Sequence, residues 1–329
     1  MKKLLLLLLI APTLGFGQGE QRYAEGTATD QDGNTFEWIN YGDLDWAIDN
    51  AEVVTFRDGT PITEVIDDTE WGNLTTAAWC YIDNDTTKPK LYNWFAVAGK
   101  HDSDETTTNK EFAPEGWRVA SESDWNDLIN YLIENGYNYD GTTTGNKIAK
   151  AAASNTGWDN SNETGQVGNN QTINNLSGLN IQPLGWRQFG NGQFFQTGVL
   201  GFIWTSSIYE TTPSTFSLSV DILFDSTSLV INSTPNTRGY PVRYVRDALT
   251  SSIKDFTDAI TIYPNPTTSI VTLQGDKQYD IEVYTIQGKK VMALTGNSID
   301  MSHLSSATYI VKALDKVENE EVSYKVVKN

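Results

Sequence analysis

The stretch that most constrains the fold is GWRVASESDW, residues 116–125, in which two tryptophans bracket a small polar turn. Ser121 is a good helix N-cap, and Asp124 stands three residues later, where its carboxylate can return a hydrogen bond to the cap backbone. Apolar residues then recur at helical spacing: Trp125, Leu128, Ile129, Leu132 and Ile133. This spacing predicts an amphipathic helix that buries one face and ends at Gly136.

Short strands and long polar loops are expected around this helix. A second, shorter helix is predicted over 146–153, which is rich in Ala and Lys. The strand candidates are 36–40, 91–97, 202–205, 215–220, 228–231 and 242–246. The Asn- and Gly-rich stretch 161–178 has no period, so it is expected to be an irregular loop, either functional or disordered.

The composition changes near residue 250. All ten tryptophans lie between Trp38 and Trp204, and the last 80 residues hold none. The chain is long enough for two domains. We therefore expect a first domain over 18–247, a linker over 248–257 and a second domain over 258–329, in which alternating strands and turn signals predict a small β-sandwich.

The first 17 residues have the pattern of a signal peptide, with a basic start, a short apolar run and small residues at its end. No other stretch is long and apolar enough to predict a transmembrane segment. The formal net charge of −19 makes nucleic acid a poor partner, because an acidic chain repels phosphate backbones.

Two acidic stretches raise the question of calcium. Asp30 and Asp32 belong to DQDGN, which resembles the start of a calcium loop, but Tyr41 stands where such a loop needs its closing Glu. Asp83 and Asp85 form a similar short pattern. Turns are the favoured interpretation of both stretches; no cofactor is expected, and calcium stays open as the alternative.

Cys80 is the only cysteine, so no intrachain disulfide can form. The chain has two histidines, no HExxH and no paired CxxC, which argues against a zinc site. We expect Cys80 to be a buried free thiol that packs like a small apolar residue.

Aromatic side chains give the candidate ligand-binding residues. Exposed aromatic rings bind sugars by stacking, whereas buried rings fill cores. Trp158 lies in the polar loop NTGWDNSN and is the best candidate for an exposed ring, while Phe189, Phe194 and Phe195 flank a Gly-rich hairpin. The tryptophans expected in the core are Trp117, Trp125, Trp186 and Trp204.

The last 72 residues (258–329) carry Tyr263, Pro264, Asn265 and Pro266, then VYTIQGKKV, IDMSHLSSATYIVKA and a closing VVKN. This combination resembles the type IX secretion sorting domain (type A) of the Bacteroidetes. Relatives usually have Gly just before the Tyr-Ile pair, where Thr308 stands here. The resemblance implies the type IX secretion machinery as a partner and a mature protein that is secreted or fixed to the outer cell surface.

Residues 27–247 contain, in order, DQDGNTFEWI, LYNWFAV, APEGWRVASESDW, GLNIQPLGWR, FIWTSS and GYPVRYVRD. These blocks resemble the Fibrobacter succinogenes major paralogous domain. The resemblance implies the C-type lectin and formylglycine-generating-enzyme superfold, an α+β fold with two helices and a twisted antiparallel sheet. Relatives often have Cys where Tyr244 stands, so Cys80 has no partner there.

The resemblance does not carry an activity over. Formylglycine-generating enzymes use a cysteine pair and a metal, and this chain has one cysteine. Two short stretches look like the calcium motifs of C-type lectins, namely Gln182-Pro183-Leu184 and Trp125-Asn126-Asp127. They stand in the reverse of the lectin order, and the second lies on the predicted helix. We expect a non-enzymatic recognition or adhesion protein for a polysaccharide or a surface protein. An enzyme related to the formylglycine-generating fold and a structural surface coat are the alternatives.

Overall fold

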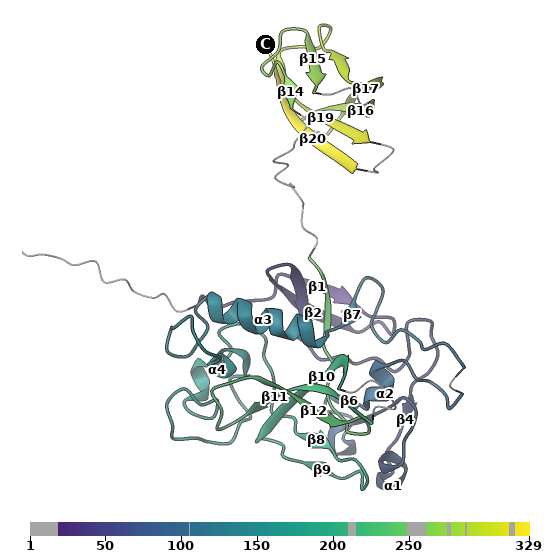
Figure 1. The fold of residues 1–329 in the computed structure, drawn as a ribbon, viewed down its shortest axis with the longest axis vertical. Coiled ribbons are helices and arrows are strands. Elements are labelled where there is room, and N and C mark those ends of the chain that lie inside the picture. Colours follow the sequence, from purple (N-terminus) through teal and green to yellow (C-terminus); the bar gives the residue numbers. More distant parts are fainter. Residues whose placement is uncertain are drawn as a thin grey trace, which may run out of the picture. The chain divides into compact units, whose positions relative to one another are not determined.

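The computed structural model describes residues 19–104, 106–209, 215–248, 261–274, 278–286, 288–315 and 320–329. The chain divides into two compact units, residues 1–248 and 249–329 (Figure 1). The expected signal peptide, residues 1–17, and residues 249–257 of the expected linker lie outside the described residues. In the described part, no helix combines the length and the apolar character needed to cross a bilayer.

The first unit is organised around a five-stranded antiparallel sheet. Its strand order is β1 (Gly26–Thr29), β2 (Thr35–Tyr41), β3 (Leu44–Ala47), β13 (Tyr244–Asp247) and β7 (Arg118–Val119). The sheet therefore joins the start and the end of the unit, and it holds the short strand that leads into the long helix.

That helix is α3 (Glu122–Glu134), and its prediction is confirmed. Ser121 and Asp124 form the expected capping box, and Gly136 has the left-handed φ of 79° that closes the C-terminus. Trp125 is fully buried and meets Trp46 of the sheet edge-to-face at 4.6 Å between ring centroids. The GWRVASESDW stretch thus ties a sheet strand to the helix that packs on that sheet.

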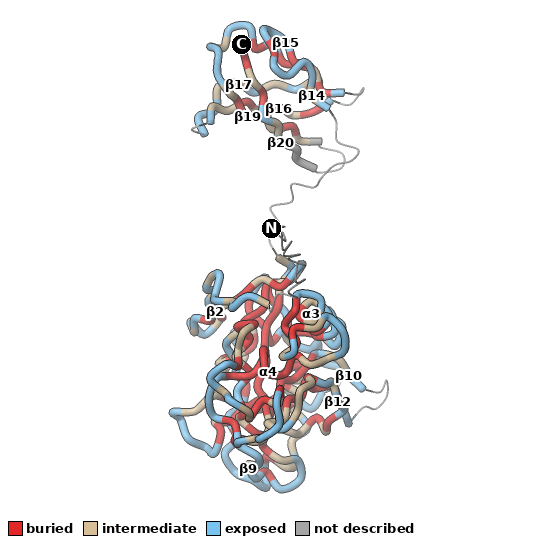
Figure 2. The backbone as a smooth tube through the Cα atoms, turned by 90° about the vertical axis from the view of Figure 1, so that its left-hand side faces the viewer, coloured by how far each residue is buried: buried red, intermediate tan, exposed pale blue. Residues whose placement is uncertain are grey.

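Both faces of the sheet are buried. Successive side chains of a strand point to opposite faces, and on β13 Tyr244 and Val245 enter two different apolar clusters. One cluster includes α3 and Trp158; the other includes Phe36, Trp117 and Trp204. Figure 2 shows this buried backbone running through the unit, with exposed loops around it.

Smaller elements complete the unit. The remaining strands are β4 (Thr63–Glu64), β5 (Ala78–Tyr81), β6 (Lys90–Tyr92), β8 (Trp186–Arg187), β9 (Phe194–Phe195), β10 (Leu200–Ile208), β11 (Phe216–Leu223) and β12 (Val230–Pro235). They form the sheets β4-β5-β6 and β10-β11-β12 and the hairpin β8-β9. The short helices are α1 (Asp68–Gly72), α2 (Trp94–Val97), α4 (Ala149–Ala152), η1 (Ile82–Asn84) and η2 (Gln171–Ile173).

The predicted strand over 91–97 is wrong in its second half. β6 ends at Tyr92, and the side chain of Asn93 accepts a hydrogen bond from the Ala96 amide, which starts the helical turn α2. An Asn side chain that satisfies a free helix amide outweighs the apolar run that suggested a strand.

The second unit consists of two antiparallel sheets over one core. The first sheet contains β14 (Ile262–Tyr263), β15 (Ile270–Leu273) and β18 (Ser298–Asp300); the second contains β17 (Lys290–Gly296), β16 (Tyr279–Thr285), β19 (Ala307–Asp315) and β20 (Glu320–Lys328). Val271 from the first sheet and Ile281 from the second share the core, as the small β-sandwich predicted from the sequence requires.

Candidate functional site

Trp158 is not the exposed ring that its polar surroundings suggested. Its side chain is 5% exposed and its Nε1–H donates to the Ser154 hydroxyl at 3.0 Å. The Gln171 side chain binds both its backbone amide and its carbonyl. The expectation of exposure is wrong because these partners satisfy the polar groups of the loop and let the indole turn into the core.

The loop over 161–178 is held by buried polar contacts. Asn174 is 2% exposed; its amide donates to the carbonyls of Ser154 and Val167, and its Oδ1 accepts from Lys150 Nζ at 2.7 Å. The irregular course was predicted correctly, and these contacts give it a defined shape.

The β8–β9 hairpin carries the exposed rings. Phe189 and Phe195 are 41% and 40% exposed, and Trp186 is half-buried with its ring centroid 6.0 Å from that of Phe195. Phe194 faces the other way and lies 5.0 Å from the Arg187 guanidinium, because neighbouring strand residues alternate in direction. The structure therefore brings Phe189 and Phe195 onto the outer side of the hairpin and separates Phe194 from them.

Arg238 completes this surface. Its guanidinium carbon lies 5.4 Å from the Trp186 ring centroid and 5.6 Å from that of Phe189. Its Nη1 donates to the Thr234 hydroxyl and to the Tyr240 hydroxyl. We call Trp186, Phe189, Phe195 and Arg238 the hairpin surface.

Further aromatic rings lie between the hairpin surface and the core of the unit. Phe202 contacts Trp186 edge-to-face at 5.5 Å and stacks on Tyr240 with centroids 4.5 Å apart and ring planes inclined by 3°. Tyr240 in turn lies 4.7 Å from the buried Trp204. The exposed rings thus rest on a close-packed aromatic column that leads into the core.

Arg187 fixes the hairpin to the rest of the unit. Its side chain is fully buried and donates to the carbonyls of Gly192 at 2.7 Å, of Ile66 at 2.9 Å and of Val65, and to the Asp68 carboxylate at 3.1 Å. A Cβ added to Gly192 would lie 2.2 Å from the Asp68 carbonyl oxygen, so only glycine allows this approach of hairpin and α1. The rings are therefore presented on a rigid platform.

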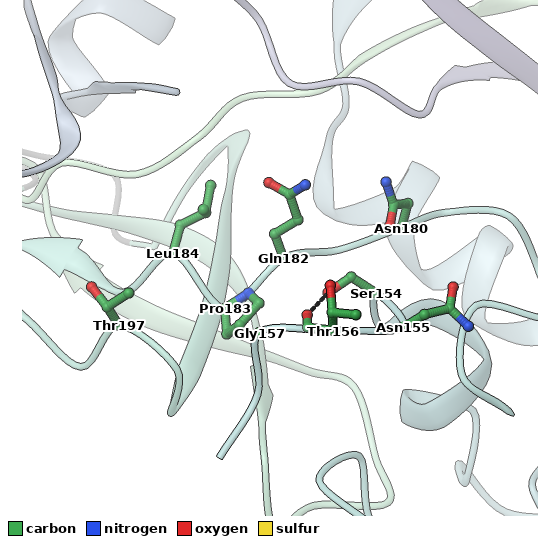
Figure 3. A pocket seen from close by; sticks show the side chains of 9 residues that line it. All are labelled: Ser154, Asn155, Thr156, Gly157, Asn180, Gln182, Pro183, Leu184 and Thr197. Carbon is green, nitrogen blue, oxygen red and sulfur yellow. Dashed lines mark hydrogen bonds between the residues drawn. The ribbon is translucent and has the colours of Figure 1, made fainter. Parts of the chain in front are cut away.

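A polar groove continues from the hairpin. Leu184 and Thr197, which flank it in sequence, line a hollow of about 510 Å³ together with Asn155, Thr156 and Gln182 (Figure 3). A second hollow of about 370 Å³ lies beside the first, since Asn180 and Gln182 line both of them. It is also lined by Asp49, Glu52 and Arg243. Figure 3 shows the amides of Asn180 and Gln182 on the same side of their segment.

The first calcium candidate is a turn. Asp30 Oδ1 accepts hydrogen bonds from the amides of Asp32 and Asn34, and these residues close the β1–β2 hairpin. Asp32 binds the backbone amides of Val54 and Thr55. Both carboxylates therefore hold backbone segments together.

Asp83 and Asp85 are also engaged within the protein. Asp83 forms an ion pair with Lys88 at 2.5 Å, and hydrogen bonds from the amide and hydroxyl of Thr87 lower the pKa of Asp85. Among the described residues, no three His, Cys, Asp or Glu side chains gather in a group that could hold a metal ion.

Cys80 is the expected buried free thiol. It packs with Trp71 and Leu91, and burial raises its pKa to about 12. Tyr244, at the position where relatives often have Cys, is fully buried in a different cluster.

The YPNP motif joins two edges of the second unit. Asn265 Nδ2 donates to the Lys325 carbonyl at 2.7 Å, and its Oδ1 accepts from the Val327 amide at 2.9 Å. The Tyr263–Pro264 and Asn265–Pro266 peptide bonds are both cis. The Asn265 hydrogen bonds therefore connect the start of this unit to its last strand. The Tyr263 side chain is 52% exposed, so the motif also presents an aromatic ring to solvent.

Sequence reasoning missed two members of the hairpin surface. The sequence places Trp186 in the core, and no motif in it points to Arg238. Alternation along the two-residue strand Trp186-Arg187 would have pointed the wrong way, because an arginine is normally expected on the exposed side, whereas here Arg187 is buried and Trp186 faces outward.

Comparison with known families agrees with both resemblances. The secretion system C-terminal sorting domain matches residues 261–329, which marks the chain as an exported cargo of the type IX secretion system. No curated protein and no solved structure matches the chain. The Fibrobacter succinogenes major domain matches residues 39–246, about two thirds of the chain. On that match, the protein belongs to the Fibrobacter succinogenes major domain family.

Proposed function

We propose that the first unit is a non-enzymatic recognition module that binds polysaccharide through the hairpin surface. The observation that carries the proposal is a group of solvent-facing rings, Phe189, Phe195 and Trp186, on a hairpin that Arg187 holds rigid. The sorting domain delivers this module to the outer cell surface or the medium of a Bacteroidetes bacterium.

Carbohydrate is the ligand class that this surface suits best. Flat rings pack against the apolar faces of sugar rings, and polar neighbours bind the hydroxyl groups. Gln188 and Gln193 flank the rings, and Gln188 Oε1 accepts from Trp186 Nε1 at 2.7 Å. Because the platform is already rigid, little entropy is lost on binding.

The affinity of one site should be modest. Burying a whole Phe side chain contributes about 1.5–3 kcal/mol, and Phe189 and Phe195 have only about two fifths of their surface left to bury. Several chains on one cell surface would strengthen attachment to a repetitive polymer by avidity. Many weak binding sites on one cell surface are therefore sufficient for adhesion to a polysaccharide.

A lectin-like fold forms part of the proposal. The strand β7 leads directly into α3 through the GWRVASESDW stretch, as the resemblance to that superfold implies. An enzyme of the formylglycine-generating kind that used Cys80 as its reactive thiol is disfavoured. The Cys80 pKa of about 12 keeps this thiol protonated at neutral pH, whereas the thiolate is the reactive form.

A glycan array tests the proposal. The mature chain, residues 18–329, would be compared with a Phe189→Ala/Phe195→Ala variant and with Tyr23→Ala, an exposed ring on the segment before β1, as the control. We expect glycan binding by the wild type and the control, with at least tenfold less by the double variant. Binding that the double variant retains in full would contradict the proposal.

A calcium arm and a chelator arm belong in the same screen. We expect equal binding in both, because the Asp30, Asp32, Asp83 and Asp85 carboxylates already bind protein groups. Loss of binding in chelator would instead establish a calcium-dependent lectin. No binding to any glycan would favour a structural coat or a protein partner.

A further inference from the structure

Arg238 is an arginine whose hydrogen-bonding capacity is partly unused. A guanidinium group has five N–H donors, and Nη1 uses its two on the hydroxyls of Thr234 and Tyr240. Within the described residues, Nε–H is buried without a hydrogen-bond partner, and both side-chain hydrogen bonds of the guanidinium come from Nη1. Unused donors on a half-buried cation need an explanation, because native structures leave few of them.

The other arginines show how unusual this is. Five of them lie within 4 Å of a carboxylate oxygen, namely Arg22, Arg57, Arg118, Arg187 and Arg246. Arg243 has no such partner among the described residues, but it is fully buried and donates to Asn50 Oδ1 and to backbone carbonyls. Among the residues that the structure describes, Arg238 is the arginine at a solvent-facing site that has no carboxylate within ion-pair distance.

The charges of Asp221 and Arg238 interact, but the carboxylate oxygens of Asp221 are hydrogen bonded to other residues. One oxygen accepts from the Ser219 hydroxyl at 2.7 Å and the other from Asn232 Nδ2 at 2.8 Å. Its side chain is 9% exposed on β11. Asp221 therefore leaves the Nη2 donors of Arg238 available.

The surroundings of Arg238 favour an anionic ligand group. The rings of Trp186 and Phe189 both contact its guanidinium, and apolar walls strengthen a charge-assisted hydrogen bond because they exclude water. A sugar ring that stacks on Trp186 or Phe189 would bring a substituent of that ring to the edge of the guanidinium.

We infer that the hairpin surface recognises an acidic polysaccharide, with a sugar ring stacked on Trp186 or Phe189 and a uronic acid carboxylate paired with Arg238. This inference rests on the proposed function and specifies its ligand class. The acidic excess of the chain opposes long-range attraction of such a polymer. Recognition therefore depends on the short-range pair at Arg238.

Two polysaccharides that share the same sugar backbone and differ only in the charge of their carboxyl groups test the inference. Affinity gel electrophoresis of the mature chain would compare polygalacturonate with its fully methyl-esterified form, in which the carboxylates are neutral. We expect the wild type to prefer polygalacturonate by roughly tenfold, the value of a charge-assisted hydrogen bond. Arg238→Gln should lose the preference and keep the weaker binding to the ester.

Two further variants keep the test sharp. Arg238→Lys retains the charge but not the planar fork, so it should keep part of the preference. Lys88→Gln removes one positive charge from an exposed ion pair elsewhere and should behave as wild type. Near-ultraviolet circular dichroism would verify that each variant is folded.

The outcomes separate this inference from the proposed function. Equal binding of both polymers by the wild type, or an unchanged preference in Arg238→Gln, overturns the acidic-ligand inference and leaves glycan recognition standing. A preference for dextran sulfate over dextran, without one for polygalacturonate, overturns the carboxylate assignment. No binding to any charged or neutral polymer overturns both.

Discussion

Arg187→Met tests whether one buried guanidinium holds the ligand-binding hairpin in place. Methionine fills much of the volume but removes every donor, so the carbonyls of Val65, Ile66 and Gly192 lose their charged partner inside the protein. The ring contacts of the guanidinium, 4.6 Å from Trp71 and 5.0 Å from Phe194, are lost as well.

The expected loss of stability is about 3–5 kcal/mol, the usual cost of removing one partner from a buried charged network. For a unit of this size, 1 kcal/mol corresponds to about 2–4 °C in Tm. The Tm of the first unit should therefore fall by roughly 6–20 °C. Glycan binding should weaken at temperatures where the variant is still folded, because the hairpin is no longer fixed.

Tryptophan fluorescence during thermal unfolding measures this directly, because all ten tryptophans belong to the first unit. Lys88→Met is the control; it breaks an exposed ion pair and should change the stability by less than about 1 kcal/mol. A loss of stability below about 1 kcal/mol in Arg187→Met would mean that the carbonyls find other donors or water, and that Arg187 does not hold the hairpin in place.

Three further predictions concern the first unit. Burial raises the pKa of Asp221 to about 6 from its ordinary 3.8, so the protonated form favours folding: this stabilisation is complete below about pH 4 and is lost as the pH rises through 6. Asp221→Asn should therefore raise the free energy of unfolding relative to wild type at pH 8, by up to about 3 kcal/mol. This gain should shrink towards pH 4, and an equal gain at both pH values would show that ionisation is not the cause. Ser121→Ala should cost about 1 kcal/mol in urea unfolding, because the Asp124 amide loses its cap, and no change would mean that water or Asp124 replaces the hydroxyl. Cys80 should not react with a thiol reagent at pH 8 until urea unfolds the chain, and rapid reaction of the native protein would contradict its burial.

Local signals were sufficient for the long helix. Ser121, Asp124 and the spacing from Trp125 onward lie within a few turns of chain, so the capping box and the buried face could be predicted from the sequence. The buried thiol of Cys80 was also predicted correctly. The strand expected over 91–97 failed at Asn93, whose side chain gives the backbone a helical alternative.

The site depended on contacts that the sequence does not show. Trp158 has polar neighbours along the chain, yet its burial depends on Gln171, which is 13 residues away. Arg238 and Trp186 are brought together by a long-range bridge, in which the backbones of Arg187 and Gly239 hydrogen bond to each other. Phe189 and Phe195 were identified because a glycine-rich hairpin is a local feature of the sequence, but the Arg238 guanidinium beside Trp186 and Phe189 comes from the tertiary fold.

Tryptophan emission of the mature chain, titrated with the strongest glycan found on the array, tests whether the hairpin surface binds the ligand. Trp186 is the half-buried tryptophan on the hairpin surface, so ligand should shift its emission. Trp186→Phe should still bind, because a ring remains, but should lose that shift. We expect Trp94→Phe, which changes a half-buried tryptophan on α2, to keep the shift. An array without any bound glycan, or a titration in which Trp186→Phe shows the full wild-type change, would contradict the claim that the hairpin surface is the binding site.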